Sequence, residues 1–207
     1  MRDEDRSVLG KPPNYELHIP LHTGNPTIDA HVLVVRMSDG GVVRTDFDEY
    51  CGSGEQHGST PEPWLRISNS GDAFRSASMD ALPAVAHDVL SAMRRWESGK
   101  QVDFRDLNLV TRGSEIQRAC YDYLLATEAG CFVSYCEIAR AIARPKASRA
   151  VAHACAINPL PLFVPCHRVI PAQAARRIAS GKSAHYGNYA YGAALKRALI
   201  EFEAGSR

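Results

Sequence analysis

The N-terminal half of the chain carries two kinds of hydrophobic pattern. Residues 31–37 form a short run rich in β-branched side chains, and a Gly-containing segment at 39–41 separates it from a similar run at 42–45. Two such runs joined by a tight turn predict a β-hairpin. Between residues 80 and 96 the apolar side chains instead recur at helical spacing, and Gly99 follows as a stop signal. The pattern therefore predicts a hairpin and then a helix.

Two stretches of this half show neither period. Residues 1–28 contain Pro12-Pro13 and a Gly-Asn-Pro at 24–26 among polar stretches, which indicates an irregular arm. Glycines and prolines also punctuate the polar run at 51–63, which is typical of a loop. The predicted hairpin and helix thus form a small α/β domain between irregular segments.

The C-terminal half is helical by pattern. Residues 114–117 (Ser-Glu-Ile-Gln) have the form of a capping box and predict a helix that Gly130 ends. A second capping box at 134–137 (Ser-Tyr-Cys-Glu) predicts a short helix, which Pro145 separates from a third helix at about 146–156. Two short helices joined by a tight turn are typical of a DNA-binding helix-turn-helix. The third helix is rich in alanine, which suits close approach to another backbone and equally suits tight internal packing.

These patterns predict an α/β (α+β) protein with two domains, residues 1–100 and 101–207. The two parts also differ in charge. Residues 1–100 carry 10 Lys and Arg against 15 Asp and Glu, and residues 101–207 carry 14 against 8, so formal charges of −5 and +6 make up the total of +1. A polyanion would therefore bind through the C-terminal part.

Composition and cysteine usage narrow the class of protein. With 45% hydrophobic and 23% charged residues, the chain is typical of globular proteins. Its charged start is not followed by the apolar core of a signal peptide, and no apolar run has membrane length. We expect a cytoplasmic protein with no membrane partner, nucleoid-associated in a prokaryote or nuclear in a eukaryote. The six cysteines, at positions 51, 120, 131, 136, 155 and 166, are then expected to be reduced thiols.

The sequence offers little for a metal ion. No Cys-x-x-Cys occurs, and Pro20 between His18 and His22 prevents a helical pair of ligands. We therefore predict no metal and no cofactor.

Residues 158–170 carry the strongest functional signal. This stretch begins with Asn158-Pro159, continues through an apolar segment and reaches Pro-Cys-His-Arg-Val at 165–169. It resembles the active-site signature of the O6-alkylguanine-DNA alkyltransferases. Further matches to that family appear in family order over roughly residues 110–204: Ser134-Tyr135, Ser148-Arg149-Ala150-Val151, Gly187-Asn188-Tyr189, Lys196 and Glu203. A Cys-His pair alone would mean little, but separated matches in one order are a specific signal.

The resemblance implies irreversible transfer of an alkyl group from O6-alkylguanine in DNA, with O4-alkylthymine a further candidate, to Cys166. Displacement at carbon needs a soft nucleophile, which a thiolate supplies. By the same resemblance His167 deprotonates Cys166 through a water, Glu203 charges the imidazole, and Asn158 braces the turn. Since Pro165 favours extended backbone, we expect the Cys-His pair on a strand-to-loop segment. The implied fold is a ribonuclease-H-like N-terminal domain and a winged-helix-like C-terminal domain.

The family also implies how the base reaches the thiol. Helix 146–156 would lie in the minor groove of double-stranded DNA, where Arg149 fills the gap left by the flipped nucleotide and Tyr135 crowds its phosphate. Ser148 and Ala150 would contact the DNA beside Arg149. The pocket for the base is expected to include four residues: Tyr189, Ala190, Val169 and Cys155. For Tyr189 simple core packing is an equal alternative. We expect the protein to act as a monomer.

Residues 171–186 depart from the family, because this loop is about ten residues longer than usual. It would be a DNA-contacting arm, a lid over the pocket, or a solvated insertion. Two other functions compete with alkyl transfer. One is a module that flips alkylated guanine without reacting, against which Cys166 argues. The other is a thiol hydrolase, for which the sequence shows no oxyanion-hole signature.

Overall fold

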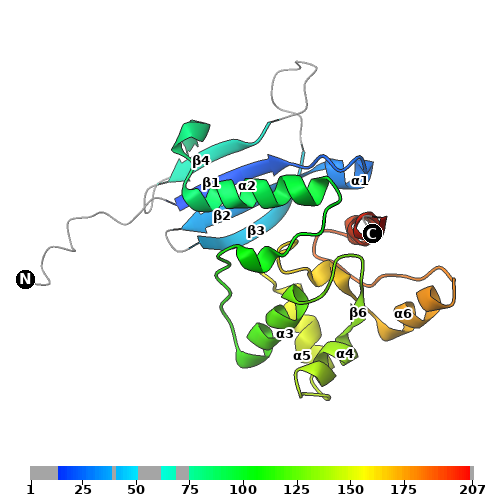
Figure 1. The fold of residues 1–207 in the computed structure, drawn as a ribbon. Coiled ribbons are helices and arrows are strands. Elements are labelled where there is room, and N and C mark those ends of the chain that lie inside the picture. Colours follow the sequence, from blue (N-terminus) through cyan, green and yellow to red (C-terminus); the bar gives the residue numbers. More distant parts are fainter. Residues whose placement is uncertain (1–13, 39–40, 51–61, 69–74, 206–207) are drawn as a thin grey trace, which may run out of the picture.

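A computed structural model describes residues 14–38, 41–50, 62–68 and 75–205. The protein is mixed α/β, as predicted, with an antiparallel sheet above a group of short helices in the view of Figure 1. The sheet has five strands in the order β3-β2-β1-β4-β5. They are β1 (Asn14–Pro20), β2 (His31–Ser38), β3 (Gly41–Glu49), β4 (Trp64–Ser68) and β5 (Arg75–Ala77).

The predicted hairpin is confirmed, but the predicted irregular arm is wrong. β2 and β3 pair antiparallel from His31 opposite Glu49 to Ser38 opposite Gly41, and the two residues between them lie outside the described ranges. β1 falls within the supposed arm and is the central strand of the sheet. Its Leu17 and Ile19 alternate into the apolar core, a period of two that the surrounding prolines and histidines conceal in the sequence. Most of the predicted 51–63 loop and residues 1–13 lie outside the described residues.

The predicted helix after the sheet begins four residues late. Helix α2 (Ala84–Glu97) starts behind Pro83, whose ring suits the helix boundary, and a short 3-10 turn occupies Met79–Ala81 instead. The expected stop is confirmed, because Gly99 adopts φ 74 directly after the helix. α2 lies across the sheet and buries Val89, Met93 and Trp96 (Figure 1).

The N-terminal part also contains a short helix, α1 (Pro26–Asp29). The described residues of the C-terminal part contain five α-helices. They are α3 (Glu115–Leu125), α4 (Tyr135–Ala141), α5 (Ser148–Ala156), α6 (Ala172–Ala179) and α7 (Ala193–Gly205). Strands β6 (Val133–Ser134) and β7 (Val169–Ile170) form a short parallel pair. The 158–170 stretch therefore follows α5 and ends in β7.

Both predicted capping boxes are present with both of their hydrogen bonds, at the starts of α3 and α4. The predicted end of α3 at Gly130 is wrong, because the helix stops at Leu125 and the Thr127 hydroxyl donates to the Tyr123 carbonyl there. α4 packs on α5 across a turn in which Ala143 has φ 56, so the two short helices adopt the predicted neighbouring arrangement.

One apolar cluster runs from the sheet into the helices. It joins Leu33 of β2 and Met93 of α2 to Leu124 of α3 and Phe163 of the 158–170 stretch. A division into two domains at residue 100 therefore stays a prediction. The ribonuclease-H-like and winged-helix-like folds expected for these domains also stay predictions. α6, within the long loop, packs on a separate small cluster with Ile170 and Ile200. In the described part of the chain, no helix has the length and apolar character that crossing a membrane requires.

Candidate active site

Cys166 lies on a single turn of 3-10 helix, Cys166–Arg168, that leads directly into β7. The expected extended entry is wrong. Pro165 has φ −80 and ψ 64, and the Cys166 amide donates to the Val164 carbonyl at 2.8 Å, which is the geometry of an inverse γ-turn. The tight turn and the helical turn after it aim the Cys166 and His167 side chains in different directions. The thiol is almost completely buried, with 6% of the residue exposed.

Asn158 holds this turn from the other end of the stretch. Its Nδ2 donates to the Val164 carbonyl at 2.8 Å and to the Cys166 Sγ at 3.1 Å, while its Oδ1 accepts from the Leu160 amide at 3.0 Å. Between these points Leu162 adopts φ 74, a conformation unusual for a residue with a side chain. The three hydrogen bonds therefore fix a strained turn and give the sulfur a donor.

His167 and Glu203 meet in the interior. The His167 Nε2 lies 3.1 Å from Glu203 Oε1, and neither side chain is more than 2% exposed. This separation is an ion-pair distance without good hydrogen-bond alignment, and the Nδ1 of His167 has no hydrogen-bond partner among the described residues. Glu203 comes from α7, so the pair joins the C-terminal helix to the turn that carries Cys166.

Sequence reasoning missed two further partners of Glu203. Arg168 donates to its two carboxylate oxygens at 2.8 and 2.9 Å, and Trp96 of α2 donates to Oε1 at 3.4 Å. Arg168 also donates to the Thr127 carbonyl. An arginine within an otherwise apolar stretch was the available signal for a buried ion pair, since buried charges are paired.

These contacts shift the ionisation of the buried groups. Burial raises the pKa of the Cys166 thiol, and the hydrogen bond from Asn158 and the charge of Lys196 act against it. Burial lowers the pKa of His167, which is therefore neutral near pH 7 and able to accept a proton. Burial also opposes ionisation of Glu203, but His167 and Arg168 outweigh it and hold its pKa well below the ordinary range. The site at rest thus pairs a thiol with a neutral imidazole and a carboxylate.

A cavity of about 700 Å³ opens onto Cys166. Four of the predicted residues line it with the thiol: Tyr135, Cys155, Tyr189 and Ala190. The buried Tyr189 hydroxyl has no hydrogen-bond partner among the described residues. Val169, which is completely buried, is not among the lining residues. A side chamber of about 310 Å³ shares Cys166, Tyr189 and Ala190 with this cavity.

Lys196 of α7 ties two walls of the cavity together. Its Nζ donates to the Val169 carbonyl at 2.7 Å and to the Asn188 carbonyl at 3.3 Å, and burial lowers the pKa of the amine. The sequence match includes Lys196 without suggesting this role. The lysine connects β7, which follows the turn of Cys166, to the loop that carries Tyr189.

The surface around α4 and α5 suits a polyanion. Arg149 is exposed in the first turn of α5, Ser148 and Ala150 on either side of it are partly exposed, and Tyr135 begins α4. From residue 138 to residue 200 the sequence contains no Asp or Glu. The basic residues in this interval are Arg140, Arg144, Lys146, Arg149, Arg168, Arg176, Arg177, Lys182, Lys196 and Arg197. Glu137 in the first turn of α4 and Glu115 beside Arg144 are carboxylates of the same region, so it is the excess of exposed basic side chains there that lowers the electrostatic cost of approaching phosphates.

The described residues contain no group of three His, Cys, Asp or Glu side chains that could hold a metal ion. Cys120, Cys136, Cys155 and Cys166 are thiols, and Cys51 lies outside the described ranges. His18, weighed above as a ligand, instead pairs with Glu16 at 2.9 Å.

Comparison with known proteins points to one family. Residues 115–205 match the model of the 6-O-methylguanine DNA methyltransferase, DNA binding domain. A probable methylated-DNA--protein-cysteine methyltransferase of Acanthamoeba polyphaga mimivirus is 38% identical over 114 residues, which cover 55% of this chain and 69% of the viral protein. The methylated-DNA--protein-cysteine methyltransferase of Mycobacterium tuberculosis is 37% identical over 121 residues, covering 58% and 67%.

The fold agrees with these matches over a longer range. The crystal structure of Mycobacterium tuberculosis OGT in complex with DNA superposes with a TM-score of 0.59 and 26% identity, covering 91% of this chain and 92% of that one. The likeness therefore includes the N-terminal sheet as well as the helical part.

Proposed function

Since the chain belongs to the methylated-DNA--protein-cysteine methyltransferase family, we propose that it removes the alkyl group from O6-alkylguanine in DNA and retains it on Cys166. The observation that carries this assignment is the buried Cys166 Sγ, which accepts a hydrogen bond from Asn158 at one end of the cavity that Tyr135 and Tyr189 also line. A cavity lined by one soft nucleophile and two tyrosine side chains suits a flat base that carries a reactive carbon.

The reaction balances without a cofactor. The Cys166 sulfur attacks the alkyl carbon, a C–S bond forms, and the bond from that carbon to O6 of guanine breaks. The electron pair of the broken bond stays on the guanine, which takes up one proton. The thiol releases one proton, so the number of protons balances. The products are a thioether and unmodified guanine, and because a thioether is stable, each molecule reacts once.

Proton removal falls to the buried pair beside the nucleophile. A neutral His167 takes the thiol proton through an intervening water, and Glu203 lies 3.1 Å from its Nε2 to stabilise the imidazolium that forms. Asn158 and Lys196 favour the thiolate once it exists. The resting thiol is therefore protonated, and it reacts only when a substrate carbon is aligned with the sulfur.

Delivery of the base requires DNA that is opened at the lesion. A reactive carbon inside the base stack cannot reach a buried sulfur, so the nucleotide must rotate out. We assign Arg149, at the exposed start of α5, to the gap in the stack, and Tyr135, at the cavity mouth, to the phosphate of the rotated nucleotide. The partner is double-stranded DNA containing alkylated guanine, bound by a monomer.

The mass of the intact protein tests the proposal. After incubation with a short duplex that contains one O6-methylguanine, the protein should gain the mass of one methyl group, and peptide mapping should place it on Cys166. Tight binding without a mass gain would support a damage-recognition module instead. Absence of both binding and mass gain would contradict any role in repair of this lesion.

Replacing Arg149 with alanine separates base extrusion from chemistry. We expect transfer from a duplex to slow by roughly 10- to 100-fold. Rotating a base out of the stack costs a few kcal/mol, and the variant lacks the side chain that would fill the gap and offset part of this cost. Transfer from free O6-benzylguanine should change less than about twofold, since a free base needs no extrusion. Single-turnover rates on the two substrates make the comparison.

The control is Arg144→Ala, which removes the same charge from the turn before α5, where Arg144 pairs with Glu115. Equal slowing of both substrates by Arg149→Ala, or equal slowing of the duplex reaction by both variants, would contradict the assignment of Arg149.

A further inference from the structure

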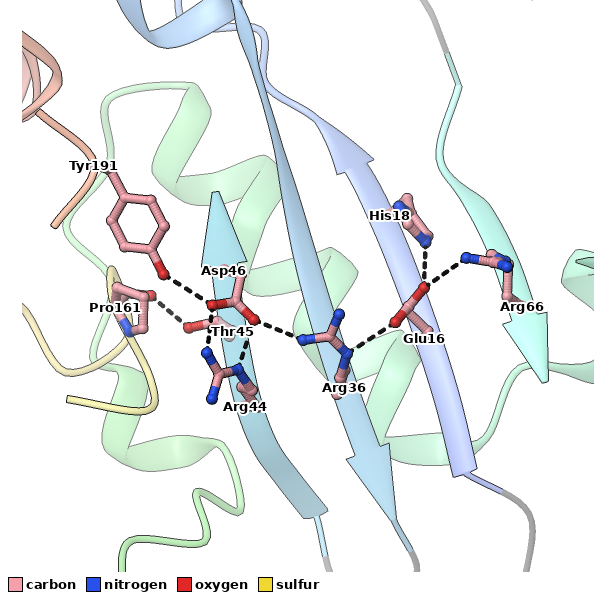
Figure 2. Close-up of polar contacts among 9 residues, drawn as sticks. All are labelled: Glu16, His18, Arg36, Arg44, Thr45, Asp46, Arg66, Pro161 and Tyr191. Atoms are coloured by element: carbon pink, nitrogen blue, oxygen red, sulfur yellow. Dashed lines mark hydrogen bonds and ion pairs between the residues drawn. The ribbon is translucent and has the colours of Figure 1, made fainter. Parts of the chain in front are cut away.

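One strand of the N-terminal sheet touches both walls of the alkyl-acceptor site. On one side the Thr45 amide donates to the Pro159 carbonyl at 2.9 Å, and the Thr45 hydroxyl donates to the Pro161 carbonyl at 2.7 Å. On the other side the Tyr191 hydroxyl donates to Asp46 Oδ1 at 2.9 Å (Figure 2). Adjacent residues of β3 thus hold the stretch before the nucleophile and the loop that carries Tyr189.

Asp46 is held in turn by a row of charges across the sheet. Arg44 donates to both of its oxygens at 2.7 and 3.0 Å, and Arg36 of β2 donates to Oδ2 at 2.6 Å. Arg36 also reaches Glu16 of β1 at 2.8 Å, and Glu16 accepts from Arg66 of β4 at 3.1 Å (Figure 2). Partial burial opposes ionisation of Asp46, but its hydrogen bonds with Arg44 and Tyr191 prevail and its pKa is lowered. The acceptor of the Tyr191 hydroxyl is therefore a fixed carboxylate.

Tyr191 connects Asp46 to the cavity through contacts of its ring. Its ring makes edge contacts with Phe47 of β3 at 5.2 Å and with Tyr189 at 5.6 Å between ring centroids. Arg44 and Tyr191 also line the side chamber that Cys166 shares. The loop that contains Tyr189 and Ala190 is thus anchored at one end by Lys196 and at the other by Asp46.

We propose that Asp46 is a positioning residue for alkyl transfer, because its bond to Tyr191 fixes the cavity wall formed by Tyr189 and Ala190 at the distance that in-line attack by Cys166 requires. The proposal rests on the proposed function. It assigns to the N-terminal sheet a part in the reaction that the sequence motif, confined to the C-terminal half, does not show. Small displacements of a bound reactant reduce rates strongly, because attack at carbon depends on alignment as well as distance.

The test is a double-mutant cycle on the transfer rate. Tyr191→Phe removes only the hydroxyl and retains the ring contacts, and Asp46→Ala removes the acceptor. Each change should slow single-turnover transfer by roughly tenfold, both from a methylated duplex and from free O6-benzylguanine, because the wall serves either substrate. The double variant should be no slower than the slower single variant, because both changes break the same Tyr191–Asp46 hydrogen bond.

Glu16→Ala is the matched control. It removes a carboxylate from the same row of charges without contacting Tyr191, so its transfer rate should stay within about twofold of the unchanged protein even if its melting temperature falls. Multiplicative effects in the double variant, slowing confined to the duplex, or equal slowing by Glu16→Ala would overturn the proposal. Loss of transfer by the unchanged protein would instead contradict the proposed function.

Discussion

Replacing Cys166 with serine should abolish alkyl transfer while leaving affinity for a duplex containing O6-methylguanine within about threefold. A serine hydroxyl is a harder and far less acidic nucleophile than a thiol, and the neutral His167 cannot make enough alkoxide for displacement at carbon. Serine still offers an acceptor to Asn158, so the turn should keep its shape. Intact mass measures transfer, and fluorescence anisotropy with a labelled duplex measures binding.

Cys155→Ser is the control for this prediction, because Cys155 is a second thiol that lines the same cavity. This variant should still gain one alkyl group. Transfer by Cys166→Ser, or its absence in Cys155→Ser, would show that the nucleophile is misassigned.

Glu203→Ala should lower the free energy of unfolding by about 3–5 kcal/mol, because it leaves Arg168 buried without its carboxylate. Transfer should also slow in the folded fraction, since His167 loses the group that stabilises its charged form. Urea denaturation monitored by circular dichroism gives the stability. Glu201→Ala, on the exposed side of the same helix, removes an ion pair with Arg197 and should change stability by at most about 1 kcal/mol. Similar losses in the two variants would contradict a special role for Glu203.

The same residue predicts how stability depends on pH. The pKa of Glu203 is lower in the folded protein than the ordinary 4.5, so its contribution is complete above that value and declines as pH falls below it. His167, whose folded pKa lies below the ordinary 6.5, adds a loss as pH falls through 6.5 because the unfolded chain then binds more protons. Unfolding curves between pH 7 and pH 4 should therefore show falling stability, with a shallower fall in Glu203→Ala below about pH 4.5.

Contacts between residues close together in the sequence could be predicted, whereas contacts between distant segments could not. Both capping boxes join groups three residues apart, so the starts of α3 and α4 follow from residue identity alone. β1 was missed although Tyr15, Leu17 and Ile19 alternate with polar residues, because prolines at 12, 13, 20 and 26 flank this short run. The burial of Glu16 depends on partners from β2 and β4, which the sequence does not identify.

The same distinction applies to the site. The motif identifies Cys166, His167 and Asn158, which lie within nine residues of one another, and the family match adds Glu203. It does not reveal that Trp96 donates to Glu203 or that Asp46 accepts from Tyr191, because those contacts exist only once the sheet has packed against the helices. The γ-turn at Pro165 was also beyond the pattern, since proline permits both extended and turn conformations.

The near-complete burial of Cys166 limits which compounds can alkylate it. A molecule that reacts once is wasted if a small electrophile in solution alkylates it first. With 6% of the residue exposed and a raised thiol pKa, the sulfur is a poor target for compounds that the cavity does not bind and align as it would a base such as O6-benzylguanine. The number of molecules still carrying a free Cys166 should therefore record the lesions met in DNA rather than the concentration of the chemicals that made them.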